Sequence, residues 1–114
     1  MAKLTTHVLD TTSGLPASTI KISLYKLIDG NSILVKNTIT NSDGRCDNPL
    51  LEGVEFLSGG YEIEFDVENY FKNNGTDSNF LKDVVVRFYV SDSDNNYHVP
   101  LLISPFSYST YRGS

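Results

Sequence analysis

The chain has 114 residues, of which 39% are hydrophobic, so it can form a packed core, and we expect one domain over residues 1–114. A net charge of −5, with no cluster of lysine or arginine to offset it, argues against binding to nucleic acid. The lone cysteine, Cys46, cannot form an internal disulfide, and the sequence contains neither an apolar leader nor a long apolar run. We therefore expect no membrane partner and a cytoplasmic location.

The first half of the chain shows the two-residue alternation of apolar and polar side chains that is typical of β-strands. Strands are expected at about residues 4–6 and 17–26, the second with Ile20, Ile22 and Leu24 on one face. A further strand is expected at about residues 33–40. The Asp-Gly-Asn sequence at 29–31 predicts a hairpin turn between the second and third strands.

The second half contains the two clearest strands. Residues 61–67 place apolar side chains on one face and carboxylates on the other, so a slip of one residue would bury the carboxylates. Residues 84–90 show the same alternation, with Val84, Val86, Phe88 and Val90 on one face. The register of both strands is therefore expected to be fixed by burial.

One short helix is expected between these two strands. Val67, Tyr70 and Phe71 have the i, i+3, i+4 spacing of a helix face, and Asn74-Gly75 is a helix stop signal. With two more strands near the C-terminus, the chain has seven or eight short strands separated by turns. This pattern predicts an all-β fold, a β-sandwich with one short helix.

The two histidines of the chain are expected on outward strand faces. If the apolar residues beside His7 and His98 face inward, both imidazoles face outward, next to apolar residues such as Leu9 and Leu102. Apolar residues on an outer face are typical of an interface. Alternation alone favours the simpler interpretation, two unrelated surface histidines.

Arg45 and the C-terminal residues are the other candidates. Arg45 follows a turn at residues 41–44, although an ordinary loop arginine would look the same. Residues 104–111 are rich in strand formers, so a last strand is expected to reach almost to Tyr111-Arg112-Gly113-Ser114. The sequence contains no nucleophile elbow, zinc-protease motif or phosphate-binding glycine loop. The carboxylates Glu62, Glu64 and Asp66 are read as a solvated sheet face and not as a glycosidase pair.

Taken together, several motifs resemble those of the 5-hydroxyisourate hydrolases of the transthyretin-related family. These motifs are Leu-Thr-Thr-His-Val-Leu-Asp at 4–10, Asp-Gly-Arg at 43–45, Tyr-His-Val-Pro-Leu-Leu-Ile-Ser-Pro at 97–105 and Tyr-Arg-Gly-Ser at 111–114. The resemblance covers essentially the whole chain, and the final tetrapeptide is its most specific part. The departure is at residues 11–15, which lack the basic residue often found before the Pro16-Ala17 pair.

The resemblance implies a prealbumin-like sandwich of two four-stranded sheets, assembled as a homotetramer that is a dimer of dimers. It implies hydrolysis of 5-hydroxyisourate to 2-oxo-4-hydroxy-4-carboxy-5-ureidoimidazoline in urate degradation, with no cofactor and no metal. The implied catalytic residues are His7, Arg45 and His98. The implied substrate-binding residues are His7, Arg45, Tyr111, Arg112 and Ser114.

Two other functions are compatible with a β-sandwich. A transthyretin-like carrier would hold an apolar or aromatic ligand between its dimers, but histidines and arginines in such a channel would raise the cost of desolvation. An immunoglobulin-like adhesion module would explain the strands but not the C-terminal motif.

Overall fold

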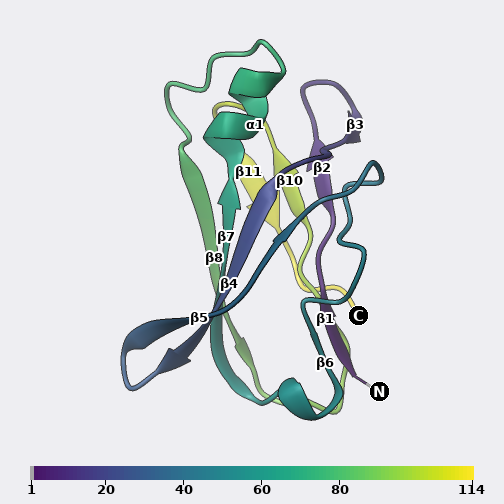
Figure 1. The fold of residues 1–114 in the computed structure, drawn as a ribbon, viewed down its shortest axis with the longest axis vertical. Helices are drawn as coiled ribbons and strands as arrows, with labels where there is room; N and C mark the ends of the chain where they lie inside the picture. Colours follow the sequence, from purple (N-terminus) through teal and green to yellow (C-terminus); the bar gives the residue numbers. More distant parts are fainter. Residues whose placement is uncertain (1) are drawn as a thin grey trace.

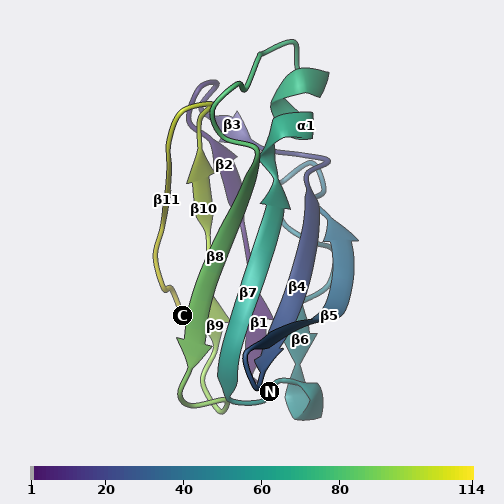
Figure 2. The ribbon, with the colours of Figure 1, turned by 90° about the vertical axis from the view of Figure 1, so that its left-hand side faces the viewer.

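The computed structural model describes residues 2–114 and is shown in Figures 1 and 2. Apart from one short helix and one 3₁₀ turn, the regular structure is β-strand. The elements in chain order are β1 (Lys3–Thr5), β2 (Val8–Asp10), β3 (Leu15–Pro16), β4 (Lys21–Ile28), β5 (Asn31–Ile39), β6 (Leu51–Glu52), the 3₁₀ turn η1 (Gly53–Glu55), β7 (Gly59–Asp66), α1 (Val67–Asn73), β8 (Asp83–Val90), β9 (Tyr97–His98), β10 (Leu101–Ile103) and β11 (Tyr108–Thr110).

The strands form two layers. One layer is antiparallel, with the strand order β5-β4-β7-β8. The other consists of the groups β6-β1-β9 and β11-β10-β2-β3. These two groups are continuous, because Leu4 pairs with Tyr97 and Val8 pairs with Leu101 in one parallel register. Counting β1 with β2 and β9 with β10, this layer has four main strands, β6, β1–β2, β9–β10 and β11, with β3 alongside β2. The predicted sandwich of two four-stranded sheets is confirmed (Figure 1).

Alternating apolar residues from both layers fill the core. Tyr61, Ile63 and Phe65 of β7 are at most 1% exposed, while Glu62 on the same strand forms a salt bridge with Arg87 on the outer face. The register predicted for residues 61–67 is therefore confirmed, and a shift of one residue would bury carboxylates. The polar side-chain atoms that are buried among residues 2–114 all have a hydrogen-bond partner.

The predicted helix is α1. Val67, Tyr70 and Phe71 are buried, and the Asp66 carboxylate accepts a hydrogen bond from the Asn69 backbone N–H at the helix start. The Tyr70 hydroxyl also donates to the buried Asp10 carboxylate at 2.8 Å, which ties the helix to β2. Burial and the neighbouring carboxylate both raise the pKa of Tyr70, so the phenol stays protonated.

The hairpin turn between β4 and β5 is also as predicted. Asp29 and Gly30 both have positive φ, at 51° and 80°, and Ile28 pairs with Asn31 across the turn. Two central residues with positive φ match the right-handed twist of the flanking strands. In Figure 1 this hairpin extends away from the two layers at the lower left.

Two sequence predictions differ from the structure. The two-residue alternation of residues 33–40 is typical of a strand with one covered face, but Ile33, Leu34 and Val35 of β5 are all 43–51% exposed, because β5 is the outer strand of its sheet. The strand predicted at 17–26 begins at Lys21, because Thr19 has a positive φ of 63° that interrupts the extended chain.

No helix within residues 2–114 combines the length and the apolar character needed to cross a membrane.

Candidate active site

The pairing of β1–β2 with β9–β10 places both histidines on the outer face of one sheet. Leu4, Thr6 and Val8 are buried and alternate with the half-buried Thr5 and His7, as the sequence predicted. His98 is half-buried and pairs with Thr5 in the parallel register. Because side chains at paired positions lie on the same face, Thr5 and His98 are neighbours, and His7 follows two residues later on that face.

A tight turn brings Arg45 to the same place. The Asn41 side-chain oxygen accepts hydrogen bonds from the N–H groups of Asp43 and Arg45, at 2.9 and 3.2 Å. Gly44 has a φ of +74°, and a Cβ atom there would collide with the Val8 carbonyl. The Val8 N–H donates to the Gly44 carbonyl at 2.8 Å, so the turn lies directly against the strand, and Arg45 forms a β-bridge with His7.

The turn also orients the His7 imidazole. Nε2 of His7 lies 2.9 Å from the backbone carbonyl of Asp43. A carbonyl oxygen can only accept a hydrogen bond, so Nε2 is the protonated nitrogen. In neutral His7, Nδ1 therefore has a free lone pair that can accept a proton.

His98 is oriented by a different partner. Its Nδ1 lies 2.9 Å from the Thr5 hydroxyl. The pKa of His98 is lowered, mainly because the ring is partly buried and further because Arg45 and His7 place positive charge nearby. The pairing of Thr5 with His98 and the bridge between His7 and Arg45 put the three side chains on one face. The lowered pKa favours neutral His98 at neutral pH.

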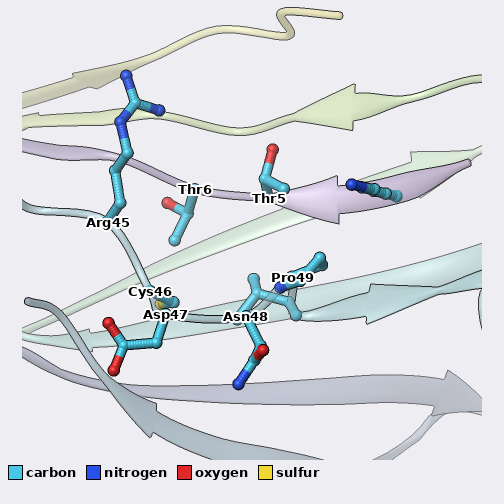
Figure 3. A pocket seen from close by; sticks show the side chains of 9 residues that line it. Thr5, Thr6, Arg45, Cys46, Asp47, Asn48 and Pro49 are labelled. Atoms are coloured by element: carbon cyan, nitrogen blue, oxygen red, sulfur yellow. The ribbon is translucent and has the colours of Figure 1, made fainter.

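A pocket of about 190 Å³ borders this group. Lys3, Thr5 and Thr6 line it together with the segment 45–50. In Figure 3 the exposed Arg45 extends away from Cys46, Asp47 and Asn48, on the side toward which the Thr5 hydroxyl also points. The guanidinium can therefore approach a ligand on the histidine face.

Cys46 lies at the edge of this pocket but is not an activated nucleophile. Its side chain packs against the hydrophobic core and is a free thiol. Burial raises the pKa of Cys46, and a protonated thiol is a poor nucleophile.

The C-terminal residues run beside His98. Gly113 forms a β-bridge with His98, in which the Gly113 N–H donates to the His98 carbonyl at 2.6 Å and the His98 N–H donates back at 3.1 Å. A Cβ atom at residue 113 would lie 3.3 Å from Cβ and Cδ2 of His98, so glycine allows the two backbones to pair this closely. The predicted last strand, which reaches almost to Ser114, is confirmed by β11 and this bridge.

Tyr111 and Arg112 are not grouped with the imidazoles within this chain. The Arg112 guanidinium lies over the Tyr97 ring, 4.3 Å from its centre, and donates to the Asn96 carbonyl at 3.1 Å. Tyr111 is 61% exposed, and both residues line a pocket between β8 and the C-terminal segment.

The two groups that orient the histidines were not among the residues predicted from the sequence. The Thr5 hydroxyl and the Asp43 carbonyl become visible only once the pairing partner of each segment is known. The one signal in the sequence was the spacing of Thr5 and His7, which puts both on one strand face. No group of three or more His, Cys, Asp or Glu side chains that could hold a metal ion is found within residues 2–114.

The chain is similar to known proteins over almost its whole length. Residues 4–113 match the model of the HIUase/Transthyretin family. The chain is 51% identical to 5-hydroxyisourate hydrolase 2 of Rhizobium meliloti, over 98% of this chain and 96% of the relative. It is 49% identical to the 5-hydroxyisourate hydrolase of Pseudomonas aeruginosa, over 100% of this chain and 93% of the relative.

Two solved structures share the fold. The 5-hydroxyisourate hydrolase of Klebsiella pneumoniae is 31% identical, with a TM-score of 0.81 over 100% of this chain and 94% of that one. Sea bream transthyretin in complex with thyroxine is 29% identical, with a TM-score of 0.90 over 98% of this chain and 95% of that one.

Proposed function

The chain belongs to the HIUase/Transthyretin family, and from this membership we propose that it is a 5-hydroxyisourate hydrolase that acts in urate degradation. The product is 2-oxo-4-hydroxy-4-carboxy-5-ureidoimidazoline. The observation that supports this function most strongly is the position of two imidazoles and a guanidinium on one outer face, in a chain about half identical to hydrolases along its whole length.

The proposed reaction assigns a role to each of the three residues. A water molecule adds to the ring carbonyl carbon, its proton is taken by a base, and the carbon–nitrogen bond breaks as the leaving nitrogen gains a proton. Imidazoles suit proton transfer and hydrogen bonding at neutral pH, so His7 and His98 are assigned to these steps. Arg45 is assigned to the carbonyl oxygen, where a guanidinium stabilises the negative charge that develops. No cofactor or metal enters these steps.

The C-terminal residues are proposed to bind substrate. Ser114 follows Gly113, whose backbone pairs with His98, and we assign its hydroxyl and carboxylate to the substrate. Tyr111 and Arg112 lie toward β8 in this chain. We therefore assign them to the substrate site through assembly, with side chains that meet substrate where subunits come together.

A homotetramer, formed as a dimer of dimers, is part of this proposal. β8 and β11 are both outer strands of their sheets, and Val85, Tyr89 and Tyr108 on them are 45–69% exposed. Unpaired edges with apolar side chains favour pairing with another copy. A strict monomer at micromolar concentration in gel filtration would contradict the proposed assembly.

The cytoplasmic location and the single domain over residues 1–114 also remain proposals. Support for the location comes from Cys46, a free thiol that is compatible with a reducing compartment. Support for the single domain comes from the family match, which covers residues 4–113.

The direct test follows the decay of freshly made 5-hydroxyisourate without any added cofactor. Arg45→Ala, His98→Asn and removal of residues 111–114 are each expected to slow the reaction, in the first two cases by at least about a hundredfold. Lys72→Ala is a matched control for loss of a cation, because Lys72 is an exposed residue of α1. Wild-type rates from all three site variants would refute the site assignment.

Carrier function is a second candidate, because sea bream transthyretin shares the fold and binds thyroxine. The outer face of this chain is less suited to an apolar ligand, since His7, Arg45 and His98 would have to be desolvated. Titration with thyroxine separates the two functions. Tight binding without any hydrolysis of 5-hydroxyisourate would favour the carrier.

A further inference from the structure

The two histidines have different hydrogen-bond partners, so they can have different roles in the reaction. His7 donates from Nε2 to the Asp43 carbonyl and keeps a free lone pair at Nδ1. His98 is held at Nδ1 by the Thr5 hydroxyl and keeps Nε2 free. The free nitrogen of His7 is therefore an acceptor, whereas the character of the free nitrogen of His98 depends on Thr5.

We propose that Thr5 is a positioning residue whose hydroxyl donates to Nδ1 of His98, so that His98 presents a protonated Nε2 to the substrate. His7 is then the proton acceptor of the pair, and neutral His98 is the hydrogen-bond donor. This inference rests on the proposed hydrolase function and assigns the two imidazoles within it.

The hydrogen-bond inventory supports this direction. The bond to His98 is the one hydrogen bond that the Thr5 side chain forms within residues 2–114. A hydroxyl that donates to Nδ1 uses its proton in that bond, whereas a hydroxyl that accepts from Nδ1–H would leave its own proton without a partner on a half-buried face.

The charges around His98 agree with the assignment. Arg45 and His7 are the charged or titratable groups that act on His98, and both oppose the addition of a second proton to its ring. A neutral imidazole can donate from its one N–H, as is known for enzymes in which a neutral histidine polarises a carbonyl.

The reaction requires one proton acceptor and one hydrogen-bond donor. The attacking water gives up a proton to the lone pair of His7 at Nδ1 as its oxygen bonds to the carbonyl carbon. The carbon–nitrogen bond then breaks, and the leaving nitrogen takes the proton that His7 gained, while the N–H of His98 at Nε2 donates a hydrogen bond to the substrate. His7 is then neutral again and His98 has kept its proton, so the count of protons on the two rings is unchanged after one turnover.

The test compares Thr5→Val, which keeps the shape but removes the hydroxyl, with Thr5→Ser, which restores it. Thr11→Val is the matched control, because Thr11 also donates a hydrogen bond of 2.9 Å between the same two chain segments, to the Ile103 carbonyl. Ring signals of His98 are followed by NMR through a pH titration. The chain has only two histidines, so a His7→Asn variant assigns them.

Loss of a donor to the neutral ring should make His98 easier to protonate. In Thr5→Val the pKa of His98 is expected to rise by about half a pH unit or more, and kcat to fall about three- to tenfold with little change in KM. Thr5→Ser should restore both quantities, and Thr11→Val should change neither.

Two results would overturn the proposal. A fall in the pKa of His98 in Thr5→Val would mean that Nδ1 is the donor, and an unchanged pKa with unchanged kcat would mean that Thr5 does not position the ring. Because NMR reads the ring without turnover, these results stay separate from a failure of the wild-type protein to hydrolyse 5-hydroxyisourate, which would instead refute the proposed function.

Discussion

The variant Gly44→Ala should show that the turn at Gly44 supports the candidate site, beyond the ordinary cost of a positive φ. Gly44 has a φ of +74°, which costs an alanine about 1–2 kcal/mol, and its new Cβ would collide with the Val8 carbonyl. Relief of that collision requires the turn to move away from β2, which weakens the hydrogen bond from the Val8 N–H to the Gly44 carbonyl and costs about 1 kcal/mol more. The expected total loss in the free energy of unfolding is about 2–3 kcal/mol.

Gly75→Ala is the matched control. Gly75 has nearly the same φ, +77°, but a Cβ atom there would meet nothing within 4 Å, so it should lose only the conformational part, about 1–2 kcal/mol. Urea unfolding at one fixed protein concentration measures both losses, because an assembly makes stability depend on concentration.

Activity provides the second measurement. The moving turn contains the Asp43 carbonyl that orients His7, and Arg45 follows it, so kcat/KM of folded Gly44→Ala should fall about tenfold or more. Gly75→Ala should keep wild-type activity. Equal stability losses in the two variants, or full activity in Gly44→Ala, would refute the reasoning.

Three further outcomes are expected. Since the folded-state pKa of His98 lies below its unfolded value, the unfolded chain binds more protons as the pH falls through about 6.5, so stability should decrease on acidification. Urea midpoints from pH 8 to pH 5 should therefore decline less in His98→Asn, and an identical decline would contradict this. Tyr70→Phe removes the hydrogen bond to the buried Asp10 and should cost about 1.5–3 kcal/mol of stability at neutral pH while leaving kcat near wild type, as urea unfolding and the decay assay can check. Gly113→Ala brings a Cβ atom to 3.3 Å from the His98 ring. Expressed as free energies, the loss in kcat/KM should exceed the loss in the free energy of unfolding, and unaltered kinetics would show that the close backbone pairing is dispensable.

Much of the fold could be predicted from the sequence, because side-chain burial follows local periodicity. Tyr61, Ile63 and Phe65 alternate with carboxylates, and only one register keeps those carboxylates in water. β5 has a similar local pattern but is an edge strand, and no local pattern shows what covers a strand. The prediction therefore failed where exposure depends on the neighbouring layer.

Part of the candidate site could likewise be predicted from the sequence, and part could not. The outward direction of His7 and His98 follows from the burial of their neighbours, so it could be predicted. The contact of Thr5 with His98 depends on a parallel pairing between the two ends of the chain, and such register is not encoded locally. The direction of the Arg112 side chain depends on the Tyr97 ring of β9, over which it lies, so it could not be inferred from the C-terminal motif.

The parallel pairing of β1–β2 with β9–β10 also has a consequence for folding. The hydrogen bonds that join Thr5 to His98 and Thr6 to Val99 connect residues 93 positions apart. Closing so long a loop has a high entropic cost, so these contacts are expected to form late, after the antiparallel strand pairs β4–β5 and β7–β8. The imidazole pair then assembles only when both ends of the chain have docked, and regained activity after denaturation would report complete folding and not merely the recovery of β-structure.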